Sequence, residues 1–310
     1  MGVSDVLAVA RHDFLNARRS RLVWGVIAIY VAFVALVFYG GSTVNDPTVT
    51  QTLFTQVALT ALLLPLVAVA GSYLAIAGER ESNTVRFLLS QPVSRRSVVV
   101  GKFLSRAALL TAALATAVIA GVAVIAVTYP EMDAASIAKF FGLTLLLVGA
   151  YVSVAIAISA ASATRSRAIS GAIGFYFLSD VLFLFGDLSI VGLLRYVLED
   201  LLGGEFHPFF YESFRTLSPA NAYINSTLAI FSPENFERIQ VPGELPFYLQ
   251  TEFMLLILAA WIVIPLLLGL VDRVVDYRVH NLSSRFTRTF IKLLPRVRRV
   301  TDTAWHIRPR

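Results

Sequence analysis

The side chain with the clearest potential for chemistry is Asp180, which lies inside a long apolar segment. A carboxylate within a membrane is costly unless it faces other protein or water, so such a residue often serves a substrate pathway or a proton relay. The alternative is a hydrogen-bonded carboxyl nearer the outer interface, which would have a structural role. Asp180 is therefore a candidate substrate-path residue, and the other long apolar segments contain no aspartate, glutamate, histidine, lysine or arginine.

Other catalytic and cofactor chemistry has no support in the sequence. Cysteine is absent, and the four histidines lie outside the apolar segments without the His-Glu-x-x-His spacing that holds zinc in metalloproteases. The phosphate-binding pattern Gly-x-x-x-x-Gly-Lys-Ser/Thr is also missing, because Gly101-Lys102 lacks the upstream glycine and the hydroxyl residue. We therefore expect no catalytic residue, metal site or cofactor in this chain, which predicts that it is not an enzyme.

The composition indicates a protein that is solvated by lipid. Of the 310 residues, 57% are hydrophobic and 15% are charged, whereas soluble domains are usually less apolar and richer in charge. A helix needs about 20 apolar residues to cross the hydrocarbon core of a bilayer. Six segments meet this test, which predicts an all-α polytopic membrane protein with a single transmembrane domain: residues 22–40, 57–77, 107–128, 140–161, 168–185 and 253–271.

The placement of basic residues predicts the orientation of the spans. Of the 26 lysine and arginine residues, only Lys139, Arg195, Arg215 and Arg238 lie on one side of the predicted membrane. Because basic residues accumulate in cytoplasmic segments, the other side is cytoplasmic and contains both termini. The net charge of +6 reflects this asymmetry, and we expect no nucleic-acid partner.

The amino-terminal segment has the pattern of an amphipathic helix. Val6, Ala10, Phe14 and Ala17 follow one another at spacings of three and four, which predicts one apolar face. We expect this segment to be an interfacial helix that precedes the first span.

Two further regions lie outside the predicted spans. A large outer loop joins spans five and six, and it includes a helical pattern over residues 188–202. Residues 272–310 form a basic cytoplasmic tail, which is suited to contact with anionic lipid headgroups.

The loop between spans two and three is more than a connector. Val85, Leu88 and Leu89 give a short helix one apolar edge, Pro92 ends it, and Ser94 can cap the helix that becomes span three. Such a helix is joined to two spans, so it is suited to transmit the movement of a cytoplasmic partner to them. The alternative is an ordinary basic loop whose helix faces lipid.

This loop resembles the signature region of permease subunits in exporter-type ABC transporters of the second type, including the branch found beside nitrous oxide reductase maturation genes. That region has an acidic-basic-acidic triplet, a Gly-Thr pair, a Leu-Leu-Ser-x-Pro-Val-x-Arg run and a Gly-Lys pair. Asn83 stands where glycine is frequent. The matching residues are Glu79, Arg80, Glu81, Thr84, Leu88, Leu89, Ser90, Pro92, Val93, Arg95, Gly101 and Lys102.

The resemblance implies a membrane subunit that couples ATP hydrolysis by a separate cytoplasmic ABC ATPase to substrate translocation. ATP and Mg²⁺ would be bound by that partner, and a second permease copy or paralogue would complete the pathway in the cell membrane. The implied coupling residues are Glu79, Arg80, Glu81, Thr84, Arg86, Pro92 and Arg95. Two alternatives remain open, namely a secondary transporter or channel that works without ATP, and a non-transporting scaffold coupled to an ATPase.

Overall fold

The computed structural model describes residues 2–19, 21–81, 94–182, 190–204, 208–227 and 247–270, all within one compact unit, Met1–Leu270. The predicted basic tail, residues 272–310, lies outside the described residues. Within those ranges every regular element is a helix, as the sequence predicts.

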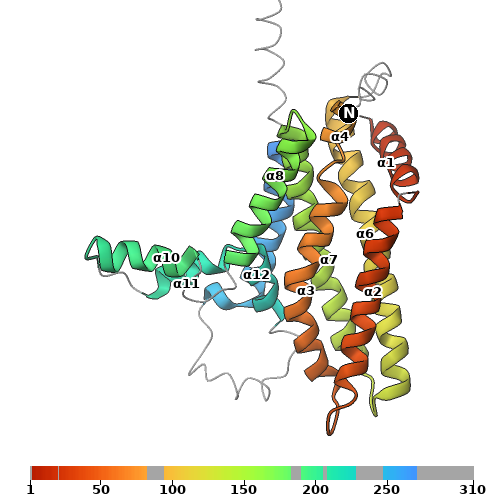
Figure 1. Ribbon diagram of the computed structural model, residues 1–310, viewed down its shortest axis with the longest axis vertical. Helices are drawn as coiled ribbons and strands as arrows, with labels where there is room; N and C mark the ends of the chain where they lie inside the picture. Colours follow the sequence, from red (N-terminus) through yellow and green to blue (C-terminus); the bar gives the residue numbers. More distant parts are fainter. Residues whose placement is uncertain are drawn as a thin grey trace, which may run out of the picture. The chain divides into compact units, whose positions relative to one another are not determined.

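Figure 1 shows the helices coloured in their order along the chain. The first seven are α1 (Val3–Ala17), α2 (Arg21–Gly41), α3 (Val49–Ser72), α4 (Ala77–Glu81), α6 (Arg95–Thr128), α7 (Ala134–Ala161) and α8 (Arg165–Tyr176). The π-helix η1 (Phe177–Val181) continues α8. It is followed by α10 (Ile190–Arg195), the π-helix η3 (Tyr196–Leu201), α11 (Pro208–Thr216), α12 (Pro219–Ser226), η5 (Phe247–Leu249) and the helix Thr251–Leu270.

Four of the described helices are long and apolar enough to cross a membrane: Val49–Glu81, Arg95–Thr128, Ala134–Ala161 and Thr251–Leu270. They contain the second, third and fourth predicted spans and the sixth as far as residue 270. The first predicted span falls on α2, in which the apolar helix Ile27–Gly41 is shorter than the other four. The fifth falls on α8 and η1, and its last residues, 183–185, lie outside the described residues. The count of six spans therefore stays a prediction.

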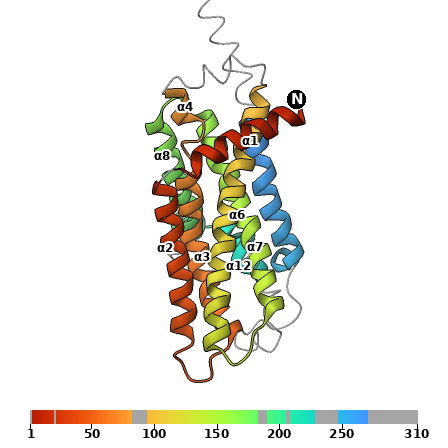
Figure 2. The same cartoon turned by 90° about the vertical axis from the view of Figure 1, so that its right-hand side faces the viewer.

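Helices α2, α3, α6 and α7 run side by side (Figures 1 and 2). Among the four long apolar helices, α7 is the most buried. Tyr151 and Leu147 in its middle turns are completely buried. Gly149 allows the helix Thr251–Leu270 to approach, because a Cβ atom there would lie 3.0 Å from Ile262 Cδ1. Close helix packing through small residues is typical of membrane bundles.

Helix α1 lies crosswise to the bundle and packs against α6 (Figure 2). Its buried residues are Val6, Val9, Asp13 and Ala17. Val6 and Ala17 are buried as the sequence predicts, whereas Ala10 and Phe14 are only partly buried. The observed face is therefore rotated toward Val9 and Asp13, and Asp13 pairs with charged side chains of α6.

Helix α6 begins where the sequence predicts a cap. The Ser94 hydroxyl accepts a hydrogen bond from the backbone N–H of Ser97 at 3.1 Å, which confirms Ser94 as the N-cap. The helix begins twelve residues before the predicted span at residue 107. Its first turns carry polar side chains that find partners in α1 and α4.

Candidate coupling site

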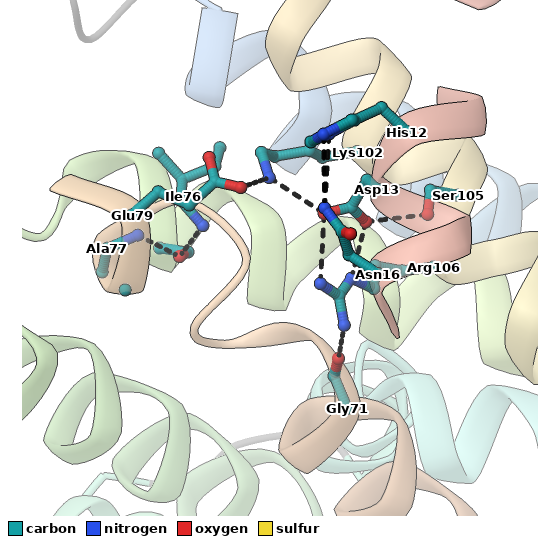
Figure 3. A network of polar contacts seen from close by, with 12 residues as sticks. His12, Asp13, Asn16, Gly71, Ile76, Ala77, Glu79, Lys102, Ser105 and Arg106 are labelled. Carbon is teal, nitrogen blue, oxygen red and sulfur yellow. Dashed lines mark hydrogen bonds and ion pairs between the residues drawn. The ribbon is translucent and has the colours of Figure 1, made fainter. Parts of the chain in front are cut away.

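Charged side chains from three helices meet at the end of the bundle where α1 and α4 lie (Figure 3). Lys102 Nζ donates to Asp13 Oδ1 at 2.9 Å and to Glu79 Oε1 at 2.6 Å. Arg106 Nε lies 3.0 Å from Asp13 Oδ2, and Ser105 Oγ donates to that same oxygen at 2.7 Å. We call these five residues, Asp13, Glu79, Lys102, Ser105 and Arg106, the junction network.

The centre of the junction network is buried, and the network is balanced in charge. Lys102 is 1% exposed and Asp13 is 4% exposed. Burial alone would raise the pKa of Asp13, but the positive charges of Lys102 and Arg106 and the hydrogen bond from Ser105 hold that pKa below its usual range. Asp13 is therefore a carboxylate at neutral pH, and two acidic side chains face two basic ones.

The spacing of residues along α6 creates one side of this network. Lys102, Ser105 and Arg106 are separated by three and four positions, so their side chains leave the same face of the helix. Arg106 also donates from Nη1 to the carbonyl oxygen of Gly71 in α3 at 2.9 Å. The network thereby joins α1, α3, α4 and α6.

The Glu-Arg-Glu triplet fixes α4 to its surroundings. Glu79 pairs with Lys102, while Arg80 donates to the carbonyl oxygens of Ser162 at 2.6 Å and Ala160 at 3.0 Å. Glu81 Oε2 accepts from the backbone N–H of Arg165 at 2.9 Å. Three consecutive side chains therefore contact α6, the end of α7 and the start of α8.

The turn before α4 is fixed as well. Ser159 Oγ in α7 accepts hydrogen bonds from the backbone N–H groups of Ile76 and Ala77, each at 3.0 Å. These bonds satisfy donors at the start of α4 that have no partner within the helix. The chain therefore enters the predicted coupling loop from a rigidly held helix.

The structure describes some of the predicted coupling residues and not others. Glu79, Arg80 and Glu81 lie in α4, and Arg95 is the exposed first residue of α6. The remaining three, Thr84, Arg86 and Pro92, lie outside the described residues. Sequence reasoning missed the roles of Asp13, Ser105 and Arg106, although the spacing of Ser105 and Arg106 from Lys102 was a usable signal.

Asp180 lies in a second buried polar cluster, where η1 follows α8. The Tyr151 hydroxyl and the Ser179 hydroxyl both donate to its carboxyl group. Ser218, the N-cap of α12, donates to the Ser179 carbonyl oxygen at 2.6 Å. Asp180 is thus fully buried, hydrogen-bonded and joined through Ser179 to α12.

Over the described ranges, no group of three or more histidine, aspartate or glutamate side chains could hold a metal ion.

These features define a multi-pass, all-helical membrane protein with an anchored helical junction. A family model described as ABC-2 family transporter protein matches residues 7–288, so the chain belongs to the ABC-2 transporter family. This membership confirms the resemblance identified from the loop motif. It also makes the chain a membrane permease component of an ABC transporter.

Two curated relatives carry the same printed name, probable ABC transporter permease protein NosY. The protein from Pseudomonas aeruginosa is 31% identical over 199 residues, which cover 61% of this chain and 70% of the relative. The protein from Stutzerimonas stutzeri is 26% identical over 279 residues, which cover 86% of this chain and 97% of the relative. The similarity therefore extends well beyond the loop motif.

Proposed function

We propose that this chain is the permease subunit of an ATP-driven exporter, in which a separate cytoplasmic ABC ATPase binds ATP and Mg²⁺. The ATPase docks on residues 82–93, and a second permease copy or paralogue completes the pathway. The chain lies in the cell membrane with both termini in the cytoplasm. The observation that carries the proposal is the anchoring of both ends of residues 82–93 to the bundle.

Because both ends of residues 82–93 are fixed to the bundle, a displacement of this segment is transmitted to the helices. Its first end is α4, held by Glu79, Arg80 and Glu81, and its second end is the start of α6, which pairs with Glu79 through Lys102. A push on residues 82–93 therefore acts on α3, α6, α7 and α8 together. In this proposal the triplet transmits force through internal contacts, and Thr84, Arg86, Pro92 and Arg95 lie at or near the docking surface.

The alternative functions differ in whether an ATPase is present. A secondary transporter needs intramembrane ligands or carboxylates for ion coupling, and Asp180 is the only acidic or basic residue in the predicted spans. A scaffold would use the ATPase without a substrate path. The ABC-2 family membership favours the ATP-driven permease over both.

Affinity purification of the chain from native membranes in mild detergent tests the proposal. We expect an ABC ATPase in stoichiometric amount, identified by mass spectrometry, together with ATPase activity. A homogeneous preparation that never contains an ATPase would favour a secondary transporter.

Replacing Glu81 with alanine is expected to uncouple the complex without preventing membrane insertion, because α4 loses its bond to the Arg165 backbone. We expect permease-dependent, vanadate-sensitive ATP turnover to fall about tenfold, which corresponds to ~1.4 kcal/mol of coupling free energy. Arg86→Ala should act similarly through the docking surface. Glu131→Ala, an exposed acidic position in the loop between α6 and α7, serves as the control. Wild-type coupling in both Glu81→Ala and Arg86→Ala would contradict these roles.

We also propose that Asp180 belongs to the substrate path. Its position in a π-helical turn supports this role, because π-bulges are frequent at functional sites. Asp180→Asn keeps an oxygen that accepts from Tyr151 but removes the charge, so we expect the folded protein to persist while ATP turnover in native lipid falls. Asp200→Asn, an exposed residue of η3, is the control. Unchanged turnover in Asp180→Asn would assign that carboxyl a structural role.

A further inference from the structure

Helices α1 and α6 approach each other closely at Gly101. A Cβ atom at this position would lie 2.8 Å from Val9 Cβ and 2.9 Å from the backbone oxygen of Val6. Real Cβ atoms do not approach so closely, and the second contact is to backbone, which cannot rotate away. Glycine inside a helix costs about 1 kcal/mol relative to alanine, so its presence in α6 requires a packing reason. The approach of α1 supplies that reason.

The next residue, Lys102, adds electrostatic contacts to the close packing at Gly101. Its ammonium group is enclosed between Asp13 of α1 and Glu79 of α4. Gly101 thus leaves room for α1 to pack closely, and Lys102 binds α1 through an ion pair that has little access to solvent. We call Gly101 and Lys102 the α1 seat.

The far end of α1 is tied to the next helix. Trp24 Nε1 in α2 donates to the carbonyl oxygen of Arg18, the C-cap of α1, at 2.6 Å. A displacement of α1 therefore also acts on the start of α2. Contacts then run without a break from α4 through Lys102 and Asp13 to α1, and through Trp24 to α2.

We infer that the α1 seat makes the amino-terminal helix part of the coupling machinery, with Asp13 as its positioning residue. In this view α1 moves together with α4 and α6, and a displacement of residues 82–93 reaches α2 through α1. The inference rests on the proposed function for the source of the displacement. The seating of α1 itself depends only on contacts within this chain.

Spin labels can test the seating directly, because the chain has no cysteine and engineered sites would be labelled uniquely. Leu7 of α1 and Leu104 of α6 are exposed and suit Leu7→Cys and Leu104→Cys. Using the full chain in nanodiscs without nucleotide, we expect a narrow distance distribution. Asp13→Asn and Gly101→Ala should each broaden it, because one removes the charge and the other blocks the approach.

Matched variants separate the seat from general effects on the helices. Asp5→Asn makes the same change of charge in α1, at a position with no ion pair to the described residues. Gly25→Ala places a methyl group where no atom lies within 4 Å. Both controls should retain the narrow distribution. A wild-type distribution in Asp13→Asn and Gly101→Ala would overturn the seat.

ATP turnover of the complete complex with its ATPase tests the coupling role. Asp13→Asn and Gly101→Ala are expected to lower permease-dependent turnover about tenfold, with unchanged KM for ATP, and Asp13→Glu should restore turnover. Variants that unseat α1 yet keep wild-type turnover would overturn the inference. If the purified chain contains no ATPase, the proposed function fails, and the label distances still decide whether the seat exists.

Discussion

Replacing Lys102 with methionine is expected to destabilise the folded protein by about 3 kcal/mol, since breaking a buried ion pair leaves uncompensated charge. Methionine keeps the length and apolar stem of lysine but removes the ammonium group. Asp13 and Glu79, which face Lys102 at 2.9 and 2.6 Å, then lose a shared cation. The free energy of unfolding, measured by titration with a denaturing detergent in micelles, reports this loss.

Arg96→Met is the matched control for this experiment. Arg96 lies on the same helix one turn and a half earlier, and it is exposed. Exposed substitutions usually change stability by less than about 0.5 kcal/mol. An effect of Lys102→Met as small as that of Arg96→Met would show that the junction network does not form.

Gly41→Ala is expected to destabilise the opposite end of the bundle by about 2 kcal/mol, as overpacking commonly does. A Cβ atom at Gly41 would lie 2.4 Å from Thr52 Oγ1 and 2.7 Å from the Tyr129 hydroxyl. That hydroxyl donates to the Phe38 carbonyl oxygen at 2.9 Å and is 2.7 Å from Thr52 Oγ1. The added methyl group must therefore separate α2, α3 and the end of α6. The same detergent titration measures the effect.

The neighbouring glycine provides the control for Gly41. Gly40 belongs to the same turn of α2, but nothing lies within 4 Å of a Cβ atom added there. Gly40→Ala should be neutral or slightly stabilising, because alanine favours the helix. Equal effects of Gly40→Ala and Gly41→Ala would mean that the close contact with Thr52 and Tyr129 is absent.

The apolar cores of the long helices could be predicted from the sequence because apolar length is a local property. Residues 107–128 and 140–161 fall inside α6 and α7. The start of α6 at Arg95 could not be predicted from the apolar span alone. Its first turns contain Lys102 and Arg106, whose charges are satisfied by protein and so allow the helix to continue beyond the apolar stretch.

The sequence identified the segment that contains the candidate site, but not the contacts that its side chains make. The Glu-Arg-Glu triplet was recognised as part of the coupling segment, but α4 itself was not predicted, and its partners Lys102, Ser162 and Arg165 depend on how distant helices pack. The short helix predicted around Val85, Leu88 and Leu89 lies outside the described residues. Asp13 pairs with Lys102 across 89 positions, and the apolar pattern of α1 correctly placed Val6 and Ala17 in the buried face but did not include Asp13. From the sequence alone, Asp13 would be taken as a solvent-exposed carboxylate. Only the packing of α1 on α6 shows that it faces Lys102 and Arg106.

The measurement that tests the central claim most directly compares the purified wild-type chain with a variant in which residues 82–93 are replaced by a glycine-serine linker of equal length. The anchors at α4 and α6 remain in this variant, so the bundle should still fold and insert. We predict that the wild-type chain retains a stoichiometric ABC ATPase with vanadate-sensitive activity and that the linker variant loses it. A linker variant that binds the ATPase and hydrolyses ATP like the wild type would contradict the assignment of this segment as the coupling element.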